Sequence, residues 1–178
     1  YRVYLTPAAM EEILSLLSWG GFSEKSLRTK SSPLLRLAAK ETKLNSKITL
    51  SQHYQNSDAA NFDEFGYVYN KDLDLLAKGH LEQTLINPRT AKEYGLTPNC
   101  ADYEAPSSLS MSAGDLKKDD ILKSLDEGLY ISNLWYLNYS DMASCRMTGM
   151  TRFACFWVEK GVLQAPLDVM RFDVSLYD

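Results

Sequence analysis

The C-terminal part of the chain has the clearest pattern of hydrophobic and polar positions. Between Gly128 and Asp178, aromatic and β-branched residues alternate with small or polar ones, and this period of two is typical of β-strands. A tight turn at residues 159–161 separates the segment FACFWV from VLQAPL and predicts a β-hairpin. We therefore expect a barrel-like β-meander in which residues 129–172 belong to the core sheet.

The N-terminal part combines a strand with an amphipathic helix. Residues 1–5 alternate like a strand, and Thr6 and Pro7 then stand at the N-cap and first helical positions. The apolar residues that follow at helical spacing are Met10, Ile13, Leu14 and Leu17. They form one stripe, and Gly20–Gly21 ends the helix. Residues 22–43 are polar and basic with little periodicity, which predicts an exposed, mobile connection.

Residues 47–127 read as short elements separated by loops. The expected elements are a strand at 47–51, a loop at 52–66, a hairpin at 73–86, a helix at 87–94 closed by Gly95, a strand at 108–111 and a helix at 119–127 closed by Gly128. Helices and antiparallel strands are thus grouped along the chain rather than strictly alternating. This order predicts an α+β fold with a mainly antiparallel sheet and a few short helices.

Composition and charge exclude several classes of protein. Hydrophobic residues make up 45% of the chain and charged residues 24%, as in an ordinary globular domain. The net charge of −4 argues against a nucleic-acid partner, because proteins that bind nucleic acids usually have a basic surface. No apolar run is long enough to span a membrane. The three cysteines lack CxxC spacing, so we expect reduced thiols in a cytoplasmic protein rather than a disulfide framework or a zinc ribbon.

Two pairs of charged residues are the candidates for a binding site. Arg146 and Arg152 lie six positions apart, so on one continuous strand they share a face and could clamp a peptide carboxylate. The alternative is structural pairing with Asp141, Glu159 or Asp173. Asp63 and Glu64 lie in a compact acidic turn. They could act as general acid and base or hold a cation, or they could be solvated and cap backbone amides.

Cys145 is the candidate nucleophile of an autonomous hydrolase. A nucleophilic thiol needs a base within hydrogen-bond reach, and the chain has only two histidines. His53, in a loop with Tyr54 and Asp58, and His80, in a hairpin, both read as unexceptional residues. Buried structural thiols are therefore the favoured interpretation of the cysteines.

Five short segments occur in an informative order along the chain. They are DEFG at 63–66, LLAKGHLEQTL at 75–85, RTAKEYG at 89–95, DILKSLDEGLY at 120–130, and Thr148–Gly149 followed by FWVEKGVLQAP at 156–166. Together they resemble the TldD/PmbA family, also known as TldE and as modulators of DNA gyrase. The resemblance implies that residues 1–178 are a single domain, the C-terminal domain of a longer protein whose N-terminal domain is not part of this chain.

The resemblance also bears on activity. TldD-type members are metalloproteases with HExxxH on the first helix of this domain, whereas TldE/PmbA-type members lack the motif and act as partner subunits. The corresponding helix here is TPAAMEEILSLLSW, and residues 1–52 contain no His. Glu11 and Glu12 are adjacent and point off different sides of a helix, so they cannot hold zinc together. The chain therefore resembles the metal-free branch, and we expect no cofactor and no activity of the chain alone.

The favoured hypothesis is a non-catalytic TldE/PmbA-like subunit of a cytoplasmic metalloprotease system that acts on peptides. The family is implicated in microcin maturation and antitoxin degradation. The subunit would contribute to assembly and to the enclosure of a peptide chamber. Its expected partners are a second copy or a TldD-like HExxxH protein, together with the peptide substrate. The alternatives are an autonomous hydrolase that uses Cys145 or Asp63 and Glu64, and a module that binds a small anionic ligand.

The aromatic residues of the meander are the basis for the expected assembly. They are Tyr130, Trp135, Tyr136 and Tyr139, and large aromatic residues are usually core or interface. No charged residue lies between Gly128 and Ser140, and an exposed strand without charge is an aggregation hazard. We therefore expect this segment to be either interior or buried against another subunit in a dimer.

Overall fold

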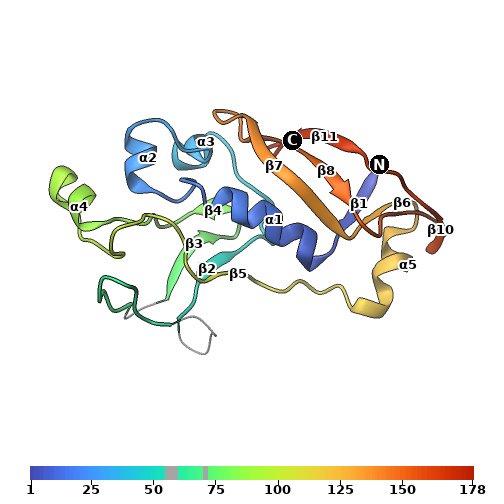
Figure 1. Ribbon diagram of the computed structural model, residues 1–178, viewed down its shortest axis with the longest axis horizontal. Helices are drawn as coiled ribbons and strands as arrows, with labels where there is room; N and C mark the ends of the chain where they lie inside the picture. Colours follow the sequence, from blue (N-terminus) through green and yellow to red (C-terminus); the bar gives the residue numbers. More distant parts are fainter. Residues whose placement is uncertain (55–59, 70–71) are drawn as a thin grey trace.

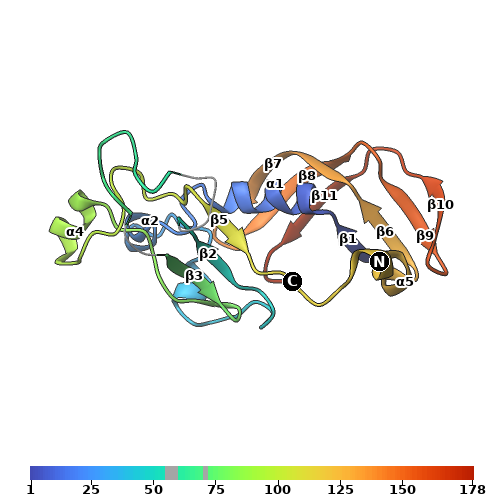
Figure 2. The same cartoon turned by 90° about the horizontal axis from the view of Figure 1, so that it is seen from below.

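The computed structural model of the chain describes residues 1–54, 60–69 and 72–178. The molecule is elongated, with α2 to α4 and β2 to β5 at one end and β1 and β6 to β11 at the other (Figure 1). Helix α1 runs between the two ends, and the view turned by 90° shows the same arrangement (Figure 2). Asp58, expected beside His53 and Tyr54, lies outside the described residues.

Most of the regular elements are short. The helices are α1 (Pro7–Leu17), α2 (Glu24–Arg28), α3 (Leu35–Ala38), α4 (Pro88–Tyr94) and α5 (Ile121–Leu125), the last preceded by a 3₁₀ turn (Lys118–Asp120). The strands are β1 (Arg2–Leu5), β2 (Leu50–Gln52), β3 (Leu73–Ala77), β4 (His80–Leu81), β5 (Leu109–Met111), β6 (Gly128–Ile131), β7 (Asn133–Asp141), β8 (Arg146–Arg152), β9 (Phe156–Glu159), β10 (Val162–Pro166) and β11 (Arg171–Ser175). In the part of the chain that the structure describes, no helix has the length and apolarity needed to cross a membrane.

The strands form three sheets, with the orders β1-β6-β9-β10, β11-β8-β7 and β4-β3-β2-β5. Every pairing between these strands is antiparallel except that of β1 with β6. The α+β fold with a mainly antiparallel sheet and short helices is thus confirmed, but the sheets are open and the expected barrel-like closure is not formed.

The meander is divided between two of these sheets. The division occurs at Ser132, which alone separates β6 from β7. The hydroxyl of Thr6 donates to the Ser132 carbonyl (2.5 Å) and the Ser132 hydroxyl donates to the Arg152 carbonyl (3.1 Å). These two bonds direct the chain out of one sheet and into the next.

Helix α1 forms as the sequence predicts. The Thr6 hydroxyl accepts from the amide of Ala9 (3.4 Å), Pro7 occupies the first turn, and Gly20 beyond the helix has φ +79°. Ala9, Leu16 and Leu17 are buried. The buried hydrophobic residues form two clusters, a larger one that includes Leu17 and a smaller one of Ala9, Ile131, Leu134 and Cys155. Ile13 packs against both, so α1 joins the two ends of the molecule.

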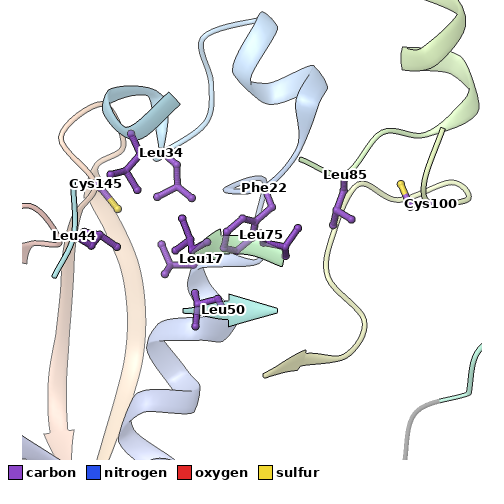
Figure 3. Packing of buried hydrophobic residues seen from close by; sticks show 11 residues of the cluster. Leu17, Phe22, Leu34, Leu44, Leu50, Leu75, Leu85, Cys100 and Cys145 are labelled. Carbon is purple, nitrogen blue, oxygen red and sulfur yellow. The ribbon is translucent and has the colours of Figure 1, made fainter. Parts of the chain in front are cut away.

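The larger hydrophobic cluster includes residues from the segment 22–43, which was expected to be exposed. Its buried members are Leu17, Phe22, Leu34, Leu37, Leu44, Leu50, Leu75, Leu76, Leu85, Cys100 and Cys145 (Figure 3). Residues 22–43 are therefore not an exposed, mobile connection, because they form α2 and α3 and bury Phe22 and Leu34 completely. The two helices are too short for their apolar residues to show a helical period, and Ser32 fixes the turn between them by bonding the Gly21 carbonyl (2.9 Å).

The expected hairpin at 73–86 and the expected helix at 119–127 are both shorter in the structure. Strand β4 covers only His80–Leu81, and Leu85 instead donates its amide to Phe22 (2.8 Å). The helix expected at 119–127 is reduced to the 3₁₀ turn and α5, because Asp126 adopts φ +58° and ends it.

Candidate functional site

A groove lies between α1 and β5. Its volume is about 910 Å³, within the range of ligand-binding clefts. Met10 and Leu14 of α1 and its C-cap Ser18 line it, four residues apart and therefore on one face of the helix. Leu109 and Met111 line it from β5. This α1–β5 groove is the candidate functional site.

Strand β5 is an edge strand that runs along the groove. Among the described residues it pairs only with β2. The amide of Ser112 donates to the Thr49 carbonyl (3.0 Å) and the Ser108 carbonyl accepts from the amide of His53 (3.1 Å). Backbone groups alternate in direction along a strand, so those of Leu109 and Met111 point to the free edge. An extended peptide could pair with this edge.

The groove face of α1 does not fit a zinc ion. Zinc sites in proteins need three or four convergent nitrogen, sulfur or carboxylate ligands. Glu11 is the only such side chain that α1 contributes to the groove, and Glu12 lines a different groove, as their adjacent positions predict. Over residues 1–54, 60–69 and 72–178, no group of three or more His, Cys, Asp or Glu side chains could hold a metal ion.

The acidic turn is held together by Asp63. Its Oδ1 accepts from the amides of Phe65 (3.0 Å) and Tyr67 (3.1 Å), and its Oδ2 accepts from the Tyr69 hydroxyl (3.3 Å). Burial, with the nearby Tyr54 and Asp63, raises the pKa of Tyr69, so this phenol stays protonated and donates. Both Asp63 oxygens are therefore engaged in the turn, while Glu64 is exposed.

The two candidate arginines have different neighbours at the two ends of β8. Arg146 forms ion pairs with Asp173 (3.1 Å) and Asp178 (3.7 Å), so the structural pairing considered as an alternative is present for Asp173. Arg152 instead lies over the Trp135 ring, with its guanidinium carbon 4.3 Å from the ring centroid. The two guanidinium groups do not form one clamp in this structure.

Cys145 does not have the surroundings of a nucleophile. It is fully buried in the larger cluster, and burial raises the pKa of its thiol to about 12. The reactive thiolate is therefore suppressed. Cys100 is also buried, and burial followed by the nearby Glu104 raises the pKa of its thiol to about 12. The Nδ1 atom of His53 lies 3.0 Å from a carboxylate oxygen of Asp72, so this ring nitrogen already has a hydrogen-bond partner.

Sequence reasoning did not single out Glu104, a buried carboxylate in an irregular segment. Its Oε2 accepts from the Ser23 hydroxyl (2.5 Å) and the Lys25 amide (2.9 Å), and its Oε1 accepts from the Asn87 amide (3.0 Å). Burial opposes its ionisation, but these bonds and one from Thr90 outweigh burial and lower its pKa. Ser23 and Asn87 are the N-caps of α2 and α4, so Glu104 ties two helix N-termini together. No local pattern reveals such a long-range role.

Comparison with known proteins relates this fold to one family. The family model described as "PmbA/TldA metallopeptidase C-terminal domain" matches residues 1–178. A crystal structure from Thermotoga maritima, described as a modulator of a DNA gyrase, is 18% identical with a TM-score of 0.81 and covers 98% of this chain and 41% of its own. A second crystal structure described as a modulator of DNA gyrase, from Bacteroides thetaiotaomicron, is 22% identical with a TM-score of 0.77. The match covers 98% of this chain and 39% of that structure's chain.

TldE from Thermococcus kodakarensis is a third structure with this fold. It is 18% identical with a TM-score of 0.73, and the match covers 99% of this chain and 44% of TldE. The chain thus spans about two fifths of the length of the structures it resembles. Curated proteins give no significant match.

Proposed function

We propose, from the premise that this chain belongs to the PmbA/TldA metallopeptidase family, that it is a non-catalytic, TldE/PmbA-like subunit of a cytoplasmic protease system that acts on peptides. An HExxxH-bearing family member supplies the metal centre and the cleavage chemistry. This chain contributes to assembly and to the wall of a chamber that holds the peptide.

The groove face of α1 is the single observation that carries this proposal. Met10 and Leu14 line this groove from α1, and Glu11 is the one side chain of the helix there that could bind zinc, whereas a zinc site needs three or four convergent ligands. A groove with a single possible ligand from α1 suits a subunit that binds a peptide and leaves the cleavage to its partner. The β5 edge supports the same role, because backbone pairing binds peptides with little dependence on their sequence.

Exposed strands support the assembly role. Trp135 and Tyr136 are 50% and 73% exposed in this chain, so the uncharged segment 128–140 is only partly interior. All residues of β10, an edge strand, are exposed as well. Apolar edges of this kind are usually covered in the assembled protein, which favours burial against a second copy or an HExxxH-bearing partner.

The two alternatives receive less support. An autonomous hydrolase would need an accessible thiol or a free acid–base pair, but Cys145 is buried and both Asp63 oxygens accept hydrogen bonds. A module for small anions would need uncommitted cations, whereas Arg146 is paired with two carboxylates and Arg152 lies over aromatic rings.

The test combines the full-length protein with the HExxxH-bearing family member of the same organism. Cleavage of a quenched fluorescent peptide and bound zinc are measured for each protein alone and for the mixture. We expect neither cleavage nor stoichiometric zinc for the protein alone, and faster cleavage for the mixture than for the partner alone. Chelator-sensitive cleavage by the protein alone, with about one zinc per chain, would show that it is itself catalytic.

A variant of the β5 edge tests the peptide contact separately. Met111→Pro removes an N–H that points to the free edge and leaves the bonds to β2 in place. We expect it to lower peptide binding to the complex about tenfold, as the loss of about one backbone bond predicts. Met111→Ala, which keeps the N–H, is the matched control. Equal binding by both variants would mean that the peptide does not pair with β5.

A further inference from the structure

A second, smaller groove lies on a neighbouring face of α1, between this helix and β7. Its volume is about 400 Å³. The residues that define its chemistry are Glu12 and Trp19 from the α1 side and Trp135 and Tyr136 from β7. Among the described residues that line it, Glu12 is the only charged one, and Arg152 lies over the Trp135 ring beside it. We refer to it as the tryptophan groove.

The aromatic residues of the tryptophan groove are unusually exposed. Trp19 is 63% exposed, and Trp135 and Tyr136 follow at 50% and 73%. Neighbouring residues of a strand normally point to opposite faces. Here a register shift between Trp135 and Asn138 places both Trp135 and Tyr136 at the surface. The sequence thus presents two large rings to solvent where regular pairing would have turned one of them away.

The backbone that presents these rings is strained. Tyr136 has φ +54°, and Phe153, which packs with Arg152 beside Trp135, has φ +63°. Side chains of this size rarely adopt positive φ, and such strain persists only where the surrounding structure holds it. Both side chains are exposed, so burial of these rings within the chain does not offset the cost. Strain of this kind is typical of binding sites.

The aromatic rings and the carboxylate of the tryptophan groove suit a planar cation. The faces of indole and phenol rings carry negative potential and attract cations, and the carboxylate of Glu12 adds the opposite charge. Among the described residues, Glu12 forms no ion pair. Arg152 already lies 4.3 Å from the centroid of Trp135, so a ring of this groove accommodates a guanidinium group. Trp19 has no such contact among the described residues and is left for a ligand. A guanidinium group stacks on aromatic rings and donates two parallel hydrogen bonds to a carboxylate, which an ammonium group cannot do.

We propose that the tryptophan groove binds an arginine side chain of a peptide, with the guanidinium against Trp19 and in contact with Glu12. The proposal concerns a groove other than the one beside β5, but it shares Trp135 and Tyr136 with the face to which the subunit role assigns assembly, so it applies to the chain with that face uncovered.

The intrinsic fluorescence of the protein tests the proposal. The chain has three tryptophans, and two of them line the groove. In a Trp157→Phe background, only these two report. The full protein is titrated with the blocked amino acid N-acetyl-arginine methylamide and with the citrulline analogue, which has the same shape and no charge. We expect saturable quenching by the arginine compound at millimolar concentration and at least fivefold weaker binding of citrulline.

Three variants locate the binding. Glu12→Gln should weaken arginine binding about threefold, and Trp19→Ala should weaken it more because it removes an exposed ring. Glu127→Gln makes the same charge change at a distant position and should leave binding unchanged. Equal binding of citrulline, or no effect of both Glu12→Gln and Trp19→Ala, would overturn the proposal. Loss of binding in Glu11→Gln alone would place the cation in the α1–β5 groove and would overturn it as well.

Discussion

Replacing Glu104 by Gln tests whether one buried carboxylate holds two helices together. Gln has the same shape, but its amide nitrogen cannot accept a hydrogen bond. The two carboxylate oxygens accept from different amides, those of Lys25 and Asn87, so in either orientation Gln leaves one amide without its acceptor. A hydrogen bond to a charged group contributes about 1.5–3 kcal/mol, and an unsatisfied buried amide adds to the loss. We expect Glu104→Gln to lower the free energy of unfolding by about 2–4 kcal/mol.

Urea denaturation of the chain at several pH values measures this effect. The pKa of Glu104 is lower in the folded than in the unfolded protein, so its stabilising effect is complete above the unfolded value and is lost as the pH falls through the folded value. The difference between Glu104→Gln and the parent should therefore be largest at neutral pH and shrink below about pH 4. Glu82→Gln, at an exposed position, is the control. A neutral-pH difference under about 0.5 kcal/mol, or one that does not change with pH, would refute the reasoning.

Three further predictions concern the core and the turns. Gly79→Ala should lower the melting temperature more than Gly66→Ala does. Both glycines have similar positive φ (+79° and +78°), but only at Gly79 would a Cβ lie 2.2 Å from a backbone oxygen, that of Leu44. Equal melting temperatures would contradict this. Trp157→Ala should lower the free energy of unfolding by about 1.5–2.5 kcal/mol, roughly half the value for a fully buried ring, because Trp157 is half-buried. Urea denaturation measures it, and a change of about 3–5 kcal/mol, as for a fully buried ring, would contradict this estimate. Cys145 should react with a thiol reagent at pH 8 only in denaturant, since it is fully buried with a raised pKa; rapid modification of the native chain, located by mass spectrometry, would contradict its place in the core.

Elements with strong local signals could be predicted from the sequence. Asn87 caps α4 by accepting from the Thr90 amide (2.8 Å), and Gly95 ends the helix with φ +68°, as the residue types indicate. Thr6 and Pro7 begin α1 for the same reason. The separation of Glu11 from Glu12 also follows from helix geometry alone, and their two grooves confirm it. These features depend on residues within one or two turns of each other.

Features that depend on distant residues could not be predicted in this way. Phe22 and Leu34 show no period, and only their packing against Leu75 and Leu85 makes residues 22–43 part of the core. The strands of the meander read as one series, but Thr6 and Arg152 bind Ser132 and divide them between two sheets.

The candidate sites follow the same division between local and distant information. The residue types on α1 were sufficient to show that a metal centre of the HExxxH kind does not fit this helix. The free edge of β5, the register shift before Asn138 and the joining of two helix N-termini by Glu104 were decided only by the tertiary structure. Each of them requires contacts between segments far apart in the chain, and a sequence pattern records only neighbours.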